Sequence, residues 1–430
     1  MSQLINRDSN RKQLLTSVAL AAVFPVLWVL ADRATATDQS GKTPRSMTRP
    51  TINAGAVAPL SNPIEDLGRR IFFDTNLSNP PGTACASCHD PARAFAGDNG
   101  SGLGVAQGAR DGETGFRKAP TLNYLAGASA FSWVDTPDGP VPVGGLFWDG
   151  RANSFEEQAR GPLFAPHEMN NQDEAALATR ARAASWAGDL TRLFGPTTLD
   201  DPASAVTAMT TALGAFQRSA VFAPFTSKFD AVKRGQAKFT EQEERGLTLF
   251  SIGQKGNCHE CHVVDLDSAN PADSLFTNFR YHALGVPRNP RLPATAAQDY
   301  FDLGLCEPLR ARGQPAEPDR YCGFFRVPTL RNIALTAPYM HNGHFDSLRD
   351  AVAFYATRDT NPELWYPDAD KFNDLPASMR TNVDLQQRPY HRKLGKRPAL
   401  KDAEVDDIVA FLHTLTDGWD GSAVSGAKSE

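Results

Sequence analysis

The sequence predicts a mainly α-helical protein built from two similar domains. Apolar residues recur at helical spacing ahead of each copy of a repeated five-residue motif and again near the C-terminus. Strand-like alternation of apolar and polar residues is sparse, and the two motif copies begin 173 residues apart, at Cys85 and Cys258. With 430 residues, the chain is long enough for two domains that each bury their own core.

Composition and charge exclude several classes of protein. Hydrophobic residues make up 41% of the chain and charged residues 22%, which is ordinary globular usage. These values fit neither a disordered chain nor a membrane protein with several spans. The net charge of −5 argues against nucleic acid as a partner, because phosphate binding requires an excess of basic side chains.

Residues 1–36 have the features of a secretory signal peptide. Basic side chains precede an apolar stretch over residues 14–30, and small residues typical of a cleavage site follow at 34–36. The apolar stretch is also long enough to remain as an uncleaved membrane anchor. We therefore expect an exported, periplasmic protein that contacts a membrane only if this segment is retained.

Three helices can be placed from the sequence in chain order. The first covers residues 64–72 and leads to the first motif. The second opens after Thr240, where Glu243 completes a capping box, and continues to residue 250 ahead of the second motif. The third covers residues 402–415, with apolar side chains on one face.

These elements suggest the domain boundaries. We expect an N-terminal domain over residues 61–235 and a C-terminal domain over residues 236–417. Residues 229–239 are interpreted as the linker, because they combine Lys, Arg and Gly between apolar ends. Residues 37–60 and 418–430 are interpreted as flexible ends.

The repeated motif has the form Cys-x-x-Cys-His, which is typical of covalent haem attachment. Two thiols at this spacing can add to the two vinyl groups of one haem, and the following His then reaches the proximal face of the iron. One copy alone could arise by chance or bind zinc, but two copies behind an export signal favour haem. The sequence therefore predicts two class-I cytochrome c-like domains, each with one haem c. The attachment and proximal residues are Cys85, Cys88 and His89, and Cys258, Cys261 and His262.

The remaining two cysteines, Cys306 and Cys322, predict a disulfide. They are separated by fifteen residues in a chain that we expect to be exported to an oxidising compartment. The alternative interpretation is a pair of free, buried thiols.

The sixth ligand decides what each iron can do, because an open position admits a small oxidant whereas a closed one mainly moves electrons. After His89, the next His is His167 and the next Met is Met169. His167 could fold back onto the iron, but its neighbour Glu168 favours a pocket role for this segment. We therefore expect a five-coordinate first haem.

Several segments together resemble the bacterial di-haem cytochrome c peroxidase and MauG family, over about residues 60–415. Their order and spacing match the family as a set. Besides the two haem motifs, the matching segments are Leu67-Gly68-Arg69-Arg70-Ile71-Phe72-Phe73-Asp74, Ala119-Pro120-Thr121-Leu122-Asn123, Phe147-Trp148-Asp149-Gly150-Arg151-Ala152, Glu168-Met169, Phe325-Arg326-Val327-Pro328-Thr329-Leu330-Arg331-Asn332 and Thr336-Ala337-Pro338-Tyr339-Met340-His341-Asn342-Gly343.

The resemblance implies roles for four residues near the haems. Trp148 matches the Trp that lies between the haems and couples them electronically. Pro162 and Glu168 match residues that line the open face of the first haem, and Gln158 matches a further polar pocket residue. Glu168 would be the acid–base group, since cleavage of a peroxide bond requires a proton to move between its oxygens.

The resemblance also places the chain on one branch of the family. The peroxidase branch has a distal Met on the second haem fourteen residues after a motif His, and the MauG branch has a Tyr there. Counting from His341 reaches Tyr355, so the chain resembles the MauG-like branch with a His/Tyr-ligated second haem. Met340 is the rival ligand. Residues 101–106 also lack the His that caps the resting first haem in many peroxidases.

Two positions depart from the family pattern. The family's calcium ligands would be matched by Thr336 and Pro338, but Lys118 stands in place of the Asn ligand, and an ammonium cannot ligate a cation. Calcium is therefore doubtful. Gly256 replaces the Trp through which MauG passes oxidising equivalents to its partner, so the exit route must use other aromatic residues, such as Trp365 or Trp419.

The resemblance implies an enzyme with two covalently bound haem c groups. Hydrogen peroxide would react at the first haem and give a high-valent di-haem state. That state would oxidise an aromatic residue, with Trp foremost, on a periplasmic partner protein, as in quinone cofactor or kynurenine formation. The alternative is a di-haem cytochrome c peroxidase that takes electrons from a small cytochrome or cupredoxin. A non-enzymatic electron carrier is a third hypothesis, which the open first haem disfavours.

Overall fold

The computed structural model describes residues 55–296, 300–368 and 370–421. These ranges all belong to one compact unit, Met47–Glu430. The signal segment over residues 1–36, most of the N-terminal segment 37–60 and residues 422–430 lie outside them. Among the described residues, no helix is long and apolar enough to cross a membrane.

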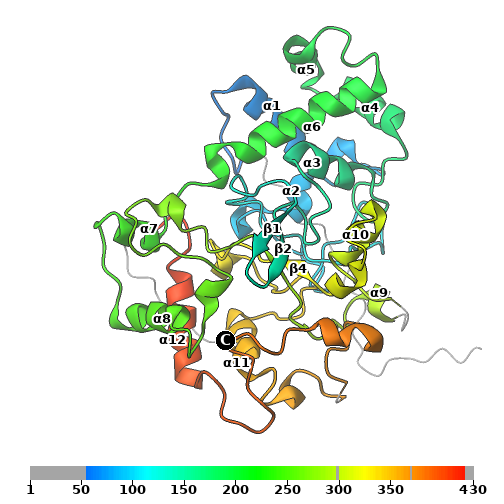
Figure 1. Cartoon of the computed structure of the whole chain (residues 1–430). Coiled ribbons are helices and arrows are strands. Elements are labelled where there is room, and N and C mark those ends of the chain that lie inside the picture. The colour runs from blue at the N-terminus through cyan, green and yellow to red at the C-terminus, as the bar shows by residue number, and fades with distance from the viewer. Residues whose placement is uncertain (1–54, 297–299, 369, 422–430) are drawn as a thin grey trace, which may run out of the picture. The chain divides into compact units, whose positions relative to one another are not determined.

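The structure is mainly helical, as the sequence predicts (Figure 1). Within the described ranges, the strands form two small two-stranded antiparallel sheets, β1 with β2 and β3 with β4. The strands are β1 (Ser132–Thr136), β2 (Gly139–Val143), β3 (Tyr281–His282) and β4 (Phe325–Arg326). The helices are α1 (Pro63–Phe72), α2 (Cys85–Cys88), α3 (Phe155–Phe164), α4 (Glu174–Ala183), α5 (Ala187–Phe194), α6 (Pro202–Arg218), α7 (Lys228–Lys233), α8 (Glu241–Ser251), α9 (Pro293–Ala296), α10 (Cys306–Arg312), α11 (Leu348–Thr357) and α12 (Asp402–His413).

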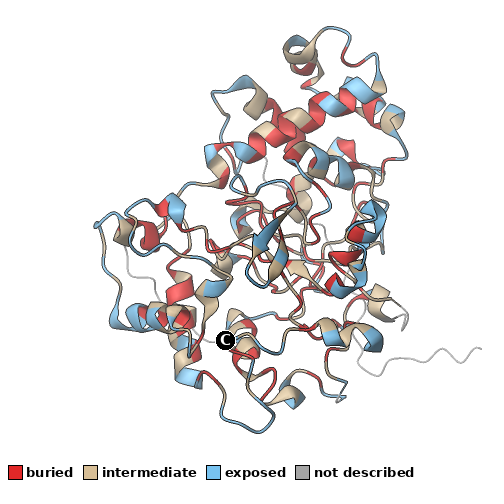
Figure 2. Ribbon diagram, viewed as in Figure 1, coloured by how far each residue is buried: buried red, intermediate tan, exposed pale blue. Residues whose placement is uncertain are grey.

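Helix α1 crosses α6 at a glycine. Asn62 caps α1 through its side-chain oxygen, which accepts from the Ile64 amide at 3.0 Å. A Cβ on Gly68 would lie 1.9 Å from the Ala212 carbonyl oxygen of α6, so only glycine permits this approach. Figure 2 shows α6 as largely buried, which fits its place above the core of the N-terminal part.

Helix α8 crosses α12 in the same way. The predicted capping box is present, with the Thr240 hydroxyl accepting from the Glu243 amide at 3.3 Å. A Cβ on Gly246 would lie 2.0 Å from the Asp407 carbonyl oxygen and 2.8 Å from Cβ of Phe411. Each Cys-x-x-Cys-His motif therefore follows a helix that is packed through a glycine onto a later helix.

The buried apolar residues form several clusters. The largest draws all its members from residues 57–222 and includes the facing sides of α1, α3 and α6. The others draw their members from residues 229–415, and one of them joins α8 to α12 through Phe250 and Phe411. The apolar side chains around the two motifs thus belong to separate cores.

The segment interpreted as a linker, residues 229–239, was assigned wrongly at its start. It begins within α7, where Phe229 and Asp230 are fully buried. Asp230 accepts from Arg331 at 2.6 Å, and both side chains are fully buried. The sequence pattern misled because this ion pair buries a charged residue that ordinarily lies at the surface.

The C-terminal end is tied to the core for as far as it is described. The Trp419 amide donates to the Thr226 carbonyl at 3.0 Å, and the Gly418 amide donates to the Thr226 hydroxyl at the same distance. The first residues of the segment interpreted as a tail, 418–430, are therefore anchored.

Candidate functional site

The first motif forms a short helical turn that presents its two thiols and its imidazole together. Cys85 and Cys88 lie on α2, and neither is in a disulfide. His89 follows directly, and its Nδ1 hydrogen-bonds the Phe95 carbonyl at 2.9 Å. Because Nδ1 carries the proton in this bond, Nε2 presents its lone pair as a metal ligand.

The second motif repeats this arrangement. Cys258 and Cys261 are likewise free of disulfides, and Nδ1 of His262 hydrogen-bonds the Phe276 carbonyl at 2.9 Å. Burial lowers the pKa of His262 to about 4, so the imidazole is neutral at physiological pH. A neutral ring with a fixed tautomer is the form that binds iron.

Thr121 and Thr329 occupy equivalent positions after the two motifs. The Thr121 hydroxyl donates to the Ala94 carbonyl at 2.6 Å, and the Thr329 hydroxyl donates to the Leu275 carbonyl at 2.7 Å. Each threonine thereby holds the segment directly ahead of the carbonyl that orients the motif histidine. The repetition extends from the crossing helices to the hydrogen bonds behind each imidazole.

A large cavity adjoins the second motif. It has a volume of about 200 Å³ and is lined by Cys258, Cys261 and His262, mostly among apolar side chains. Tyr355 on α11 and Met340 also line it. The Tyr355 hydroxyl makes no hydrogen bond to any residue in the described ranges, so it is free to meet a group inside the cavity.

These features test whether the residues fit a haem. Two free thiols, a neutral imidazole with its second nitrogen open, and an apolar cavity form the donor set and surroundings of a covalently attached haem. The unbonded Tyr355 hydroxyl supplies an oxygen on the same cavity. The second site fits the group, and the first site has the same donor set.

Trp148 lines the same cavity and forms a hydrogen bond with Lys118, which lies near the first motif. Its indole Nε1 donates to the Lys118 carbonyl at 2.9 Å, and its own carbonyl accepts from the Arg326 amide at 2.8 Å. Burial lowers the pKa of His89, and the Lys118 charge acts in the same direction. Trp148 therefore stands between the cavity and the segment behind the first imidazole.

Glu168 lies close to the first pair of thiols. Burial, with a smaller contribution from the Glu168 carboxylate, raises the pKa of Cys85 and Cys88 to about 12. Desolvation raises the pKa of Glu168 itself, although 34% of its side chain remains exposed. His167 lies 3.7 Å from the Glu168 carboxylate and packs its ring on Phe116, with centroids 4.7 Å apart.

Gln158 and Pro162 lie on α3, one turn apart on the same face. Pro162 lies inside the helix, and its carbonyl accepts from the Met169 amide at 3.1 Å. This bond joins α3 to the segment that carries Glu168. The structure therefore connects the three residues that the sequence assigned to the first pocket.

The residues at the expected calcium position do not fit a calcium ion. The Lys118 ammonium donates to the Thr336 carbonyl, and the Arg93 guanidinium donates to the Ala337 carbonyl. Burial, reinforced by Arg93, lowers the pKa of Lys118 to about 7. Two basic side chains thus donate to the carbonyl groups of Thr336 and Ala337, so the Thr336 oxygen meets a hydrogen-bond donor instead of a divalent cation.

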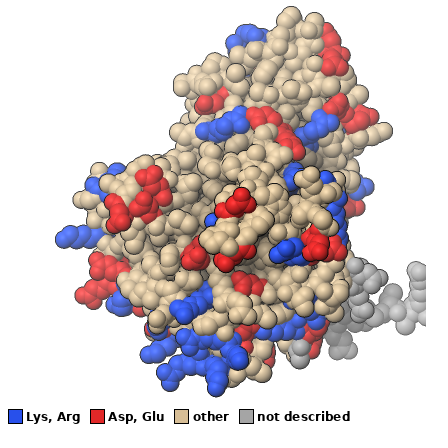
Figure 3. Space-filling view, in the orientation of Figure 1, with Lys and Arg blue, Asp and Glu red and all other residues tan. Residues whose placement is uncertain are grey.

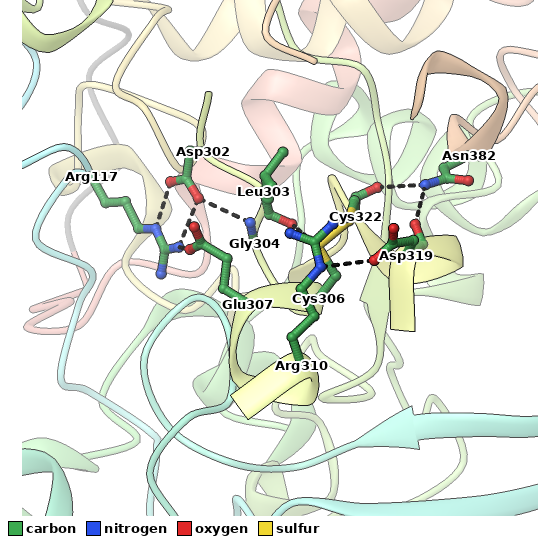
Figure 4. Close-up of a disulfide and its surroundings, with 10 residues drawn as sticks. All are labelled: Arg117, Asp302, Leu303, Gly304, Cys306, Glu307, Arg310, Asp319, Cys322 and Asn382. Atoms are coloured by element: carbon green, nitrogen blue, oxygen red, sulfur yellow. Dashed lines mark hydrogen bonds and ion pairs between the residues drawn. A yellow bond between two sulfur atoms is a disulfide. The ribbon is translucent and has the colours of Figure 1, made fainter. Parts of the chain in front are cut away.

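Cys306 and Cys322 form a disulfide at the start of α10 (Figure 4). Beside it, Arg310 donates to Asp319 at 2.7 Å. On the opposite side in the same view, Arg117 donates to Asp302 at 2.6 Å. Arg117 also binds Asp149, the residue after Trp148, at 2.6 Å.

Sequence reasoning gave no role to several residues at the site. The carbonyl groups of Phe95 and Phe276 orient the motif histidines, but backbone acceptors carry no sequence signal. Tyr390 lies beside Tyr355, with ring centroids 6.4 Å apart. The basic residues around Tyr390 were the signal that could have drawn attention to it.

Comparisons with known proteins agree with this geometry. The family model for di-haem cytochrome c peroxidase matches residues 62–238. The methylamine utilization protein MauG of Paracoccus denitrificans is 38% identical over 375 residues, which cover 85% of this chain and 92% of that protein. The cytochrome-c peroxidase IdrP2 of a Pseudomonas species is 30% identical over 67% of this chain and 72% of that protein. The crystal structure of the diheme peroxidase BthA from Burkholderia thailandensis superposes with a TM-score of 0.80 at 44% identity, covering 86% of this chain and 90% of that chain.

Proposed function

Since the chain belongs to the family of di-haem cytochrome c peroxidases and MauG, we propose that it is a MauG-like enzyme that oxidises an aromatic residue of a partner protein. Its relatives are oxidoreductases that use hydrogen peroxide, and it is an enzyme of the same kind. The finer assignment, with Trp as the foremost target, rests on the residues around the second site.

The proposal includes two covalently bound haem c groups in two cytochrome c-like domains. The repeated motif geometry supports it, as do the two glycine-mediated helix crossings and the separate cores around each motif. Haem would supply an iron at which hydrogen peroxide is reduced and oxidising equivalents are held. The relatives and the signal-like N-terminus support a periplasmic location.

Glu168 is proposed to move the proton at the first site. Its raised pKa keeps the carboxyl group closer to neutral pH than an exposed Glu, which suits a group that must accept a proton and then release it. Its position near Cys85 and Cys88 supports this role. Gln158 and Pro162 would shape the pocket from α3.

The choice between the MauG-like branch and the peroxidase branch depends on Tyr355. Tyr355 lines the same cavity as the neutral His262, and its hydroxyl is unbonded, whereas a peroxidase of the other branch would offer a thioether. A phenolate is anionic and hard, so it favours the oxidised forms of iron. Trp148, which lines the same cavity, would connect the second site to the first.

The test compares two variants of the loaded enzyme. Tyr355→Phe should abolish or change the low-spin signal in the electron paramagnetic resonance spectrum, while Met340→Leu should leave it intact. With hydrogen peroxide and a Trp-containing peptide, mass spectrometry should find oxidised Trp, and Tyr355→Phe should suppress it. The reverse pattern of spectral effects would assign the ligand to Met340 and refute the proposal.

The second candidate is a peroxidase that draws electrons from a small cytochrome or cupredoxin. Met340 favours it, because this thioether lines the same cavity as Tyr355. Rapid peroxide-dependent oxidation of a reduced small cytochrome c, with no modification of the peptide, would establish this alternative.

A further inference from the structure

A strongly basic loop lies on a protein that is acidic overall. Residues 388–397, here called the basic loop, contain no acidic side chain, while the whole chain has a net charge of −5. None of its cations forms an ion pair with a described residue, and all but Arg392 are exposed. Figure 3 shows Lys and Arg side chains gathered at the bottom of the view, where the chain leads into α12. The cations are Arg388, Arg392, Lys393, Lys396 and Arg397.

The basic loop borders the second site. Arg388 lines the cavity, and its guanidinium donates to the Gly253 carbonyl at 3.2 Å, five residues ahead of Cys258. Two apolar side chains are exposed within or beside the loop, Leu385 at 47% and Leu394 at 69%. These leucines add apolar contact area beside the cations.

Tyr390 joins this surface to the cavity. It lies within the basic loop and is only 5% exposed, and it lines the cavity beside Tyr355. The two rings are 6.4 Å apart between centroids. The Tyr390 hydroxyl lies 3.4 Å from the Asp384 carboxylate and 3.3 Å from the Gln387 side-chain oxygen. Of these two groups, the Asp384 carboxylate can accept the phenolic proton.

The two tryptophans expected as exits are placed less favourably. Trp365 packs its ring on Phe345 and Phe354, and its indole donates to the Thr357 hydroxyl at 2.9 Å. Tyr390 lines the cavity, whereas Trp365 and Trp419 are not among the described residues that line it.

We propose that the basic loop docks an acidic protein and that Tyr390 passes electrons from this partner to Tyr355. The inference rests on the proposed function for the oxidant, which is hydrogen peroxide. The charge of the basic loop determines which partner surface it can bind, because its five unpaired cations attract an acidic surface and repel a basic one. The partner must also present an oxidisable aromatic side chain near its acidic surface.

The redox balance is simple. Each peroxide takes up two electrons and two protons and leaves as two waters. Tyr390 gives one electron at a time toward Tyr355, while its phenolic proton moves to the Asp384 carboxylate. An electron from the partner's aromatic residue and the returning proton then restore Tyr390. Two partner tyrosines oxidised in this way lose two electrons and two protons and couple to one dityrosine.

Docking can be tested by binding, without turnover. The probe is a random copolymer of Glu and Tyr, and a copolymer of Lys and Tyr is the charge control. The docking variant is Arg392→Glu/Lys393→Glu/Lys396→Glu, and a matched variant with the same change in charge is Arg192→Glu/Lys238→Glu/Arg320→Glu. We expect about a tenfold weaker affinity for the acidic copolymer in the docking variant and less than about a twofold change in the matched one, at low salt.

The salt dependence is part of the expected result. The screening length falls from about 30 Å at 0.01 M salt to about 8 Å at 0.15 M, so the difference between the two variants should shrink over this range. Equal weakening in both variants would overturn the docking surface. Heparin binding with no binding of the acidic copolymer would also overturn it, in favour of a nucleic-acid-like polyanion.

Electron transfer through Tyr390, here called the relay, is tested by measuring the rate of copolymer oxidation separately from the affinity for the copolymer. Tyr390→Phe should lower the rate of peroxide-dependent dityrosine formation in the copolymer several-fold while its affinity stays unchanged. Tyr321→Phe is the matched control, because Tyr321 is also buried but belongs to a cluster that includes neither Tyr355 nor Tyr390. An unchanged rate in Tyr390→Phe would overturn the relay.

The two levels of the proposal fail differently. If the wild-type enzyme binds the acidic copolymer through the basic loop but oxidises neither this copolymer nor the Trp-containing peptide with peroxide, the relay and the proposed function fail together and the docking surface stands. If the wild-type enzyme oxidises both copolymers equally well, the proposed function stands and the docking surface fails.

Discussion

Gly246→Ala is expected to loosen the α8–α12 crossing and to disturb the second site alone. The new Cβ would lie 2.0 Å from the Asp407 carbonyl oxygen, whereas ordinary contacts begin near 3.4 Å. The helices must therefore separate by about 1.4 Å. A gap of about 0.5–1 Å already forfeits a quarter to a half of the dispersion attraction between packed atoms. Overpacking of this kind costs about 3 kcal/mol, the upper end of its usual range.

The effect on the site follows from the residues on these two helices. Phe250 on α8 and Ile408 on α12 both line the cavity, so their separation should alter the absorption and spin signals of the second haem. For a part of 150–250 residues, about 3 kcal/mol corresponds to a fall of roughly 6–12 °C in Tm. Thermal unfolding followed at the haem absorption band measures both effects.

Two substitutions in the same chain serve as controls. Gly188→Ala on α5 introduces a Cβ that meets nothing within 4 Å, so it should be neutral or stabilise by up to about 1 kcal/mol through helix propensity. Gly68→Ala should destabilise as much as Gly246→Ala but change the signals of the first haem. The reasoning is refuted if Gly246→Ala costs no more than Gly188→Ala, or if both crossing variants alter both haems equally.

Three further predictions concern proton transfer, calcium and the disulfide. The rate of reaction with peroxide should rise with pH as the Glu168 carboxylate forms, at a pH above the ordinary Glu range because its pKa is raised, and stopped-flow traces of Glu168→Gln should lose this dependence. Removal of calcium with a chelator should leave the absorption spectrum and Tm of the wild-type enzyme unchanged, whereas Lys118→Asn should make Tm depend on added calcium; a wild-type response to the chelator would contradict the contact between Lys118 and Thr336. Replacing Cys306 and Cys322 together by Ser should cost about 3 kcal/mol in denaturant unfolding, as expected for a closed loop of about 15 residues, with the haem spectra intact.

The sequence predicted the helices that carry clear end signals or a one-sided apolar pattern. The helices predicted over residues 64–72, 240–250 and 402–415 are confirmed as α1, α8 and α12. Helix α6 was not predicted from the sequence, because small and apolar residues cover most of its surface and no single apolar face stands out. The strand β2 escaped because Pro140 and Pro142 interrupt the alternation that marks a strand.

Site residues could be proposed from the sequence at those positions where the chemistry requires a particular residue type. The two haem motifs and the Tyr355 position follow from spacing and resemblance. Contacts made by backbone carbonyl groups could not be predicted from the sequence, because any residue can supply a carbonyl group. The contact between Lys118 and Thr336 could be seen only in the structure, since the two residues are 218 positions apart in the chain.

The segment over residues 117–121 joins the two sites through four different kinds of contact. Arg117 binds Asp149 and Asp302, the Lys118 carbonyl holds the Trp148 indole, its ammonium reaches Thr336, and Thr121 supports the segment behind His89. Trp148 and the next residue, Asp149, are therefore both held by a single stretch of backbone. Because Trp148 also lines the second cavity, a shift of this stretch must change both sites together, whereas a shift at either helix crossing need change only one. Electronic coupling between the haems should accordingly be more sensitive to residues 117–121 than to either core.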